Sequence, residues 1–194
     1  MKKQLVIHYN APVVLNFALL SLIVLILDFF TGGSTTDTYF CVYRSSFGDP
    51  LTYVRMFGHV LGHAGYAHYM NNMMLLLVVG PPLEEKYGSK KLLLCILVTA
   101  LVSGLVQVFF FPSTALLGAS GIVFMMIVLS SLSGMKNGSI PLTLILVVIL
   151  YLGGELWDAL TVRDSVSQLT HIVGGLCGAV LGFMMGGHRS TSRR

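Results

Sequence analysis

Long runs of apolar residues alternate with short polar connections along the chain, and this pattern predicts its helices. Each run is close to the ~20 residues that cross the hydrocarbon core of a bilayer. Because backbone hydrogen bonds in lipid must be satisfied within the segment, continuous apolar runs favour helices. We therefore predict an all-α membrane protein, a single domain over 1–194 with six transmembrane helices. The predicted helices cover residues 12–30, 62–79, 91–110, 118–134, 140–157 and 167–186.

The ends of the first helix raise two further points. Residues 1–30 superficially resemble a signal peptide, because Lys2 and Lys3 precede the apolar run. That run is longer than a usual signal core and no convincing cleavage site follows it, so we expect an uncleaved first helix. The connection after it, from Thr31 to about Leu61, is the longest in the chain. Connections of that length are usually functional or structured.

Lysine and arginine residues predict the orientation of the bundle, because cytoplasmic loops carry an excess of them. With the N-terminus inside, only Arg44, Arg55 and Arg163 lie outside. Both termini are therefore predicted to be cytoplasmic, and the loop over 31–61 to be external. The basic residues on the cytoplasmic side are Lys2, Lys3, Lys86, Lys90, Lys91, Lys136, Arg189, Arg193 and Arg194.

Composition supports the membrane assignment and narrows the function. Hydrophobic residues make up 55% of the 194 residues and charged residues only 10%. Soluble domains are rarely so apolar. The net charge of +4 is modest, and nothing in the sequence resembles a nucleic-acid-binding surface. Cys41, Cys95 and Cys177 match no metal or redox spacing, and no disulfide is predicted.

Polar side chains gather at the outer ends of three predicted helices. They are His63, His68 and Asn72 on the second helix, Ser120 on the fourth and His171 on the sixth. Because polar groups within membrane helices are costly, each needs a partner or a purpose. Their common depth, just below the external surface, is the strongest functional signal in the chain.

Ser120 lies between Gly118 and Gly121, and such a serine is most often a small residue at a helix contact. The alternative is a nucleophile. His171 begins a helix whose Gly174 and Gly178 form a G-x-x-x-G face. Docking of that face on the glycines around Ser120 would bring the hydroxyl and the imidazole within hydrogen-bonding distance, as a nucleophile and its general base require.

His68 and Asn72 are four residues apart and share a helix face. They are either a polar helix end solvated by the external loop or donors to an oxyanion, together with the backbone N–H of Ser120. His63 lies roughly 140° around a helix from His68, so it need not face the same site. Phe124, four residues after Ser120, is either a stacking partner for the His171 ring or a core aromatic residue.

Neither a third catalytic residue nor a metal is predicted. Glu155, Asp158 and Asp164 lack helical spacing to His171, which favours a Ser–His dyad over a triad. His59 and His63 have the i, i+4 spacing of zinc ligands. No glutamate accompanies them as the zinc-protease pattern requires, so we expect no metal and no cofactor.

Taken together, these motifs resemble those of the rhomboid intramembrane serine proteases, over about residues 55–178. The nucleophile motif of the family resembles "GASG" at 118–121, and its helix-2 pattern resembles His63, His68 and Asn72. Its helix-6 pattern resembles His171, Gly174 and Gly178. Its pattern after helix 2 resembles Glu84, Gly88 and Ser89. The Trp-Arg pair that the family has in its first loop is here Val54–Arg55.

The resemblance implies that Ser120 is the nucleophile and His171 the base, with His68 and Asn72 in the oxyanion hole and His63 in a supporting role. It implies cleavage of the transmembrane segments of membrane proteins near the outer face. The small core favours a prokaryotic plasma membrane, and Gly153–Gly154 favour a flexible fifth helix as a gate. The alternatives are a non-catalytic rhomboid-like binding protein and a small transporter, although the internal repeats of transporters are not found.

Overall fold

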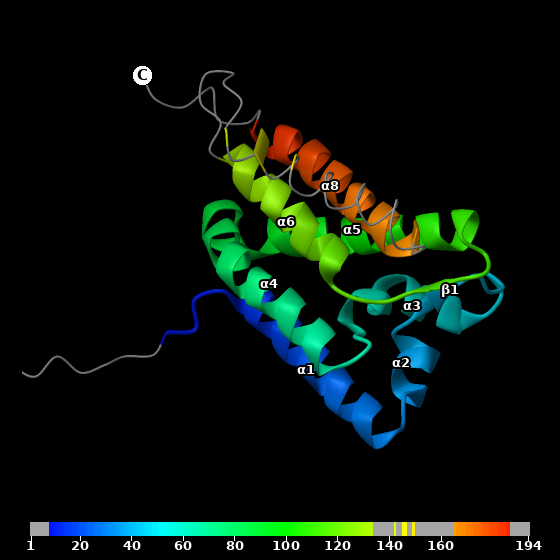
Figure 1. The fold of residues 1–194 in the computed structure, drawn as a ribbon. Helices are drawn as coiled ribbons and strands as arrows, with labels where there is room; N and C mark the ends of the chain where they lie inside the picture. The colour runs from blue at the N-terminus through cyan, green and yellow to red at the C-terminus, as the bar shows by residue number, and fades with distance from the viewer. Residues whose placement is uncertain (1–7, 134–141, 143–144, 147–148, 150–164, 187–194) are drawn as a thin grey trace, which may run out of the picture.

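The computed structural model describes residues 8–133, 142, 145, 146, 149 and 165–186, and all structural statements below concern these residues. Five long helices dominate (Figure 1). They are α1 (Pro12–Phe30), α4 (Tyr66–Tyr87), α5 (Ser89–Phe110), α6 (Ser120–Ser133) and α8 (Ser165–Gly186). Shorter elements are α2 (Ser34–Tyr39), β1 (Val42–Tyr43), α3 (Pro50–Gly58), the 3-10 helix η1 (His59–Leu61) and β2 (Ala115–Leu116).

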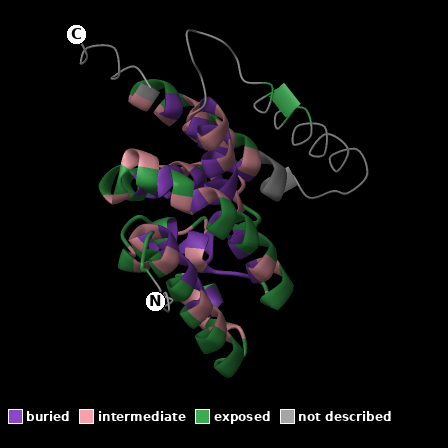
Figure 2. Ribbon diagram, turned by 90° about the vertical axis from the view of Figure 1, so that its left-hand side faces the viewer, coloured by how far each residue is buried: buried purple, intermediate pink, exposed green. Residues whose placement is uncertain are grey.

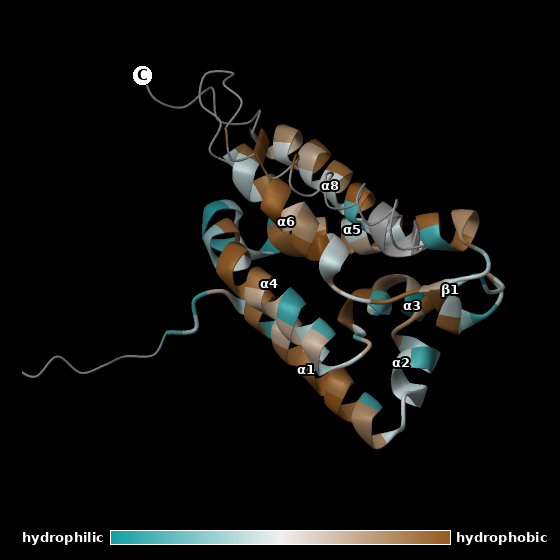
Figure 3. Cartoon of the chain, viewed as in Figure 1, coloured by the Kyte–Doolittle hydropathy of each residue, from teal (hydrophilic) through white to brown (hydrophobic). Residues whose placement is uncertain are grey.

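Two of the described helices are long and apolar enough to cross a membrane, namely α1 and α5. Residues 120–133 and 170–185 form shorter apolar helices. Large hydrophobic side chains such as Leu19, Ile23 and Phe30 are exposed around α1, and the hydropathy colours of Figure 3 show that this helix is mostly apolar. A helix that is apolar all round is typical of a membrane span. The helix predicted over 140–157, and Gly153–Gly154 within it, fall outside the described residues apart from a few isolated positions.

Buried residues concentrate in the interior of the helix bundle (Figure 2), and the largest core cluster draws on α1, α4, α5 and α6. The core of this region is built on α6, nearly all of whose apolar residues are buried. Its fully buried members include Ile122, Met125, Met126 and Leu129. A helix buried on every side holds its first residue in a fixed place, which matters because that residue is Ser120.

The second predicted helix differs from the structure at both ends. It begins at Tyr66 instead of Gly62, because Gly65 has a φ of 155°, a conformation that disfavours helix. It also continues past Val79, through Pro81 and Pro82, to Tyr87. Prolines in a helix interior remove backbone donors and usually end it. The two turns that follow the prolines are nevertheless helical, and one of their side chains bonds to α1.

That side chain is Glu84, whose carboxylate accepts hydrogen bonds from the backbone N–H groups of Val13, at 2.9 Å, and Val14, at 3.0 Å. The first N–H groups of a helix have no partner within the helix. Glu84 supplies two acceptors and a negative charge at the positive end of α1, where both stabilise. This contact explains why the carboxylate is tolerated at only 3% exposure.

Replacing Glu84 with alanine should therefore destabilise the fold. The buried N–H of Val14 and the partly buried N–H of Val13 would lose their acceptor, which costs about 1–3 kcal/mol for a buried group left unsatisfied. The measurement is the free energy of unfolding in detergent. The matched control is Glu85→Ala, because Glu85 is exposed and such changes usually stay within about 0.5 kcal/mol. Equal effects of the two substitutions would contradict this account of Glu84.

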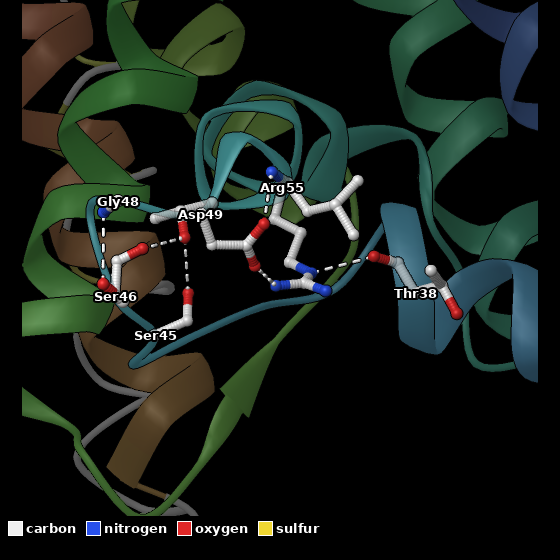
Figure 4. A network of polar contacts seen from close by, with 8 residues as sticks. Thr38, Ser45, Ser46, Gly48, Asp49 and Arg55 are labelled. Atoms are coloured by element: carbon white, nitrogen blue, oxygen red, sulfur yellow. Dashed lines mark hydrogen bonds and ion pairs between the residues drawn. The ribbon is translucent and has the colours of Figure 1, made fainter.

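Arg55 organises the segment between α1 and α4 (Figure 4). Its buried guanidinium donates from Nε to the carbonyl oxygen of Thr38, at 2.8 Å, and pairs with Asp49 at 3.4 Å. It also lies over the ring of Tyr43, at 4.6 Å from the centroid. Asp49 in turn caps α3 by accepting from the N–H of Leu51. One cation thus links α2, β1 and α3, and β1 pairs with the chain that leads to Ser120.

Candidate active site

Ser120 is the first residue of α6, and the chain before it is held from two sides. β2 pairs antiparallel with β1, with Leu116 opposite Val42. The N–H of Gly118 then donates to the carbonyl oxygen of His59, at 2.9 Å. Gly118 has a φ of 119°, which residues with a side chain rarely adopt. The backbone before Ser120 is therefore fixed by a turn that needs glycine.

The ring of His68 lies directly against this turn. A Cβ added at Gly118 would be 2.8 Å from Cε1 and 2.9 Å from Nε2 of His68. Gly118 thus allows the imidazole to approach the backbone two residues before Ser120. The structure brings together α4 and the start of α6, which are far apart in the sequence.

One hydrogen bond orients the ring of His68, and another joins Asn72, one turn further along α4, to the backbone of His68. The backbone N–H of Ala64 donates to Nδ1 of His68 at 3.4 Å, which leaves the ring proton on Nε2, the nitrogen facing Gly118. Asn72 is buried, and its Nδ2 donates to the backbone carbonyl of His68 at 2.9 Å. One N–H of this amide is therefore used within α4, and a second remains.

His63 does not lie on the helix that was predicted for it. Residues 62–65 precede α4 and are not helical, so the expected angular separation of His63 from His68 is wrong. The two rings instead meet edge to face, with centroids 5.1 Å apart. Nδ1 of His63 is 3.1 Å from the carbonyl oxygen of Leu61, and the ring also contacts Tyr69. His63 therefore supports the position of His68.

Glycines form the contact between α6 and α8, which run side by side in the same direction (Figure 1). A Cβ at Gly174 would overlap the carbonyl oxygen of Gly121, and one at Gly178 would overlap the backbone of Met125. Thr170, one turn before Gly174 on α8, also packs on Gly121, with its Cγ2 3.0 Å from where a Cβ would lie. The two backbones can approach this closely only because side chains are absent.

His171 lies between Thr170 and Gly174, the two residues of α8 that pack on Gly121. Its ring contacts that of Phe124, with centroids 6.3 Å apart and planes inclined at 63°. Phe124 is one helical turn after Ser120 on α6. The imidazole is therefore level with the first turn of α6.

Sequence reasoning overlooked two glycines of this contact. A Cβ at Gly175 would be 2.6 Å from Cε1 of Phe124, and one at Gly182 would be 2.7 Å from Cδ1 of Leu132. Because Gly175 has no side chain, the Phe124 ring has room beside His171. The signal was present in the sequence, since Gly182 continues the four-residue spacing of Gly174 and Gly178.

The role of His59 was also missed. The residue is buried in η1, with Nδ1 3.3 Å from the carbonyl oxygen of Arg55, and its own carbonyl accepts from Gly118. It therefore holds the turn before Ser120. Among the described residues, no group of three or more His, Cys, Asp or Glu side chains is arranged to bind a metal.

Acidification should destabilise the protein through His59. Burial lowers the pKa of this imidazole from 6.5 to about 4, so the unfolded chain binds the proton first as the pH falls. Stability is then lost between pH 6.5 and about 4, by up to ~1.4 kcal/mol per pH unit from this group. The measurement is the unfolding free energy against pH, with His59→Gln as the comparison. An unchanged slope in that variant would contradict the assignment.

Comparison with models of known families gives a match over most of the chain. The family model described as Rhomboid domain matches residues 50–188, which include α3 to α8 and every candidate site residue. No curated protein matches the chain.

Proposed function

The chain belongs to the rhomboid family, a family of intramembrane proteases, and we propose that it is a serine endopeptidase that cleaves transmembrane segments of membrane proteins near the outer face. Ser120 is the nucleophile and His171 the general base. The observation that carries this proposal is the glycine-lined contact of α6 with α8. Gly121 packs on both Thr170 and Gly174, and these residues flank His171.

Phe124 supports the pairing of the two catalytic groups. Its ring contacts His171 from the same face of α6 that carries Ser120, one turn earlier. A base must be held within hydrogen-bond reach of the proton that it accepts. Phe124 restricts the rotation of the imidazole, and Gly175 provides the space for the Phe124 ring.

The reaction proceeds in two steps. Ser120 Oγ bonds to the carbonyl carbon of the substrate while its proton passes to His171. The C–N bond then breaks, and the leaving amine takes the proton from His171. Water from the external side attacks the acyl-enzyme and gives a proton to His171. The C–Oγ bond breaks, Ser120 recovers its proton, and an acid and an amine are released.

His68 stabilises the oxyanion that forms in each step. Its Nε2–H, favoured by the Ala64 hydrogen bond to Nδ1, faces the turn that leads to Ser120. The backbone N–H of Ser120, at the free N-terminal end of α6, is a second donor, and the remaining N–H of Asn72 is a third. Fixed donors of this type are worth about 3–4 kcal/mol each in a dry site.

The site is placed for water and for membrane substrates. With both termini cytoplasmic, the N-terminal halves of α4, α6 and α8 face the outer side of a prokaryotic plasma membrane. Water reaches Ser120 there, while the rest of α6 is buried. Metals and nucleic acids have no part in this chemistry.

Cleavage of a model transmembrane substrate in liposomes tests the function. The purified protein should produce two fragments, and Ser120→Ala should produce none. The matched control is Ser131→Ala on the same helix, whose hydroxyl only donates to the carbonyl oxygen of Ile127. Cleavage that survives in Ser120→Ala would refute the proposed nucleophile. A folded protein without cleavage would favour a non-catalytic rhomboid-like binding role.

A further inference from the structure

A groove lies between the end of α1 and the start of α4, on the side of α4 where Gly65 and Tyr66 begin the helix. Its volume is about 530 Å³, within the range of sites that hold small molecules. Most of its wall is apolar and comes from α1, and its one charged residue among those described is Asp28. The walls include Leu22, Leu25, Ile26, Phe29 and Tyr66.

Asp28 is a half-buried carboxylate that pairs with no cation among the described residues. Its Oδ1 accepts a hydrogen bond from the N–H of Thr36 at 2.7 Å. Within the described part of the chain, the only ion pair is that between Arg55 and Asp49. Ionisable side chains within membrane-spanning segments usually pair with another polar or charged group. Asp28 also lines the groove, so a cationic group bound there can donate to its carboxylate.

The volume of the groove favours a lipid chain over a helix. An α-helix is at least ~10 Å across with its side chains and rises about 5.4 Å per turn, so about 530 Å³ holds little more than one turn. A single acyl chain is much thinner and matches the apolar wall of leucine, isoleucine and phenylalanine. The occupant thus has an apolar tail and a cationic group at the depth of Asp28.

We propose that this groove binds a phospholipid whose headgroup carries a primary ammonium, phosphatidylethanolamine. Its acyl chain lies along the α1 wall, and its ammonium donates to the Asp28 carboxylate. A choline headgroup has no N–H to donate, and a glycerol headgroup leaves the lipid anionic and is repelled by Asp28. Tyr66 is 69% exposed at the groove, as is typical of aromatic residues at headgroup level. The site is independent of the proposed proteolytic activity.

Lipid binding to the purified full-length protein tests the proposal. Phosphatidylethanolamine, phosphatidylcholine and phosphatidylglycerol with identical acyl chains are titrated in neutral detergent, and the bound lipid is counted by native mass spectrometry. We expect the ethanolamine lipid to bind about tenfold more tightly than the other two, the effect of one charge-assisted hydrogen bond. Glycerophosphoethanolamine, which lacks acyl chains, should not compete with it.

Two variants and a control connect the preference to the groove. Asp28→Asn keeps an oxygen for the N–H of Thr36 and should abolish the preference, whereas Ile26→Trp should reduce binding of all three lipids by filling the groove. The control is Asp37→Asn, which removes the same charge from an exposed position on α2 and should retain the preference. Thermal unfolding verifies that each variant is folded.

Three results would overturn the proposal. One is an equal preference for phosphatidylethanolamine in the wild type and in Asp28→Asn. Another is tighter binding of the choline or glycerol lipid by the wild type. The third is a dimer without lipid that Ile26→Trp dissociates, which would identify a second copy of the chain as the occupant.

Discussion

Replacing His171 with alanine is expected to lower the rate of substrate cleavage by about 10⁴–10⁶-fold, as much as Ser120→Ala. Residues that act as one unit in serine proteases show such losses, and these losses are not additive. The double variant should therefore be no slower than either single variant. The measurement is kcat/KM for a model transmembrane substrate in all three variants.

The control for this comparison is His8→Ala, because His8 is an exposed histidine outside every helix. Its activity should equal that of the wild type. Size-exclusion chromatography and thermal unfolding establish that each variant is folded. A double variant whose loss is the product of the two single losses would contradict the dyad, because it would mean that the two side chains act independently.

Adding a single methyl group at Gly174 should impair both stability and catalysis. Alanine has the higher helix propensity, which by itself would stabilise α8 by about 1 kcal/mol. At this position, however, the Cβ would overlap the carbonyl oxygen of Gly121. Overpacking of this type costs about 1–3 kcal/mol. Separating the helices also moves His171 away from Ser120, and a displacement of about 1 Å can cost 10²-fold in rate.

The matched control on the same helix is Val180→Leu. Val180 is exposed on α8, so the additional carbon extends away from α6. Unfolding in detergent and substrate cleavage are measured for both variants. If Gly174→Ala were as stable and as active as Val180→Leu, close approach of the two backbones would not be what positions the dyad.

The apolar runs predicted four of the five long helices closely, and α4 is the exception. The first run and α1 both span Pro12 to Phe30, because Pro12 favours a first helical turn and a polar, glycine-containing segment follows Phe30. For α5 and α6 the predicted bounds differ from the observed ones by at most two residues. In these segments the local signal and the tertiary structure agree.

Contacts between distant segments were not predictable in the same way. Glu84 bonds to the start of α1, about 70 residues away, and helical periodicity contains no trace of that contact. The fold of residues 62–65 and the role of His59 likewise depend on contacts with the chain before Ser120. Gly175 was overlooked because it lies outside the four-residue spacing, although it accommodates Phe124.

Covalent labelling of Ser120 tests the central claim most directly. The folded protein is treated with a fluorophosphonate, and the modified residue is identified by peptide mass spectrometry. The account predicts an adduct on Ser120 in the wild type and a rate of modification at least about 10²-fold lower in His171→Ala, since the base activates the hydroxyl. An adduct that forms on Ser120 equally fast in both proteins, or no adduct on the folded wild type, would contradict it.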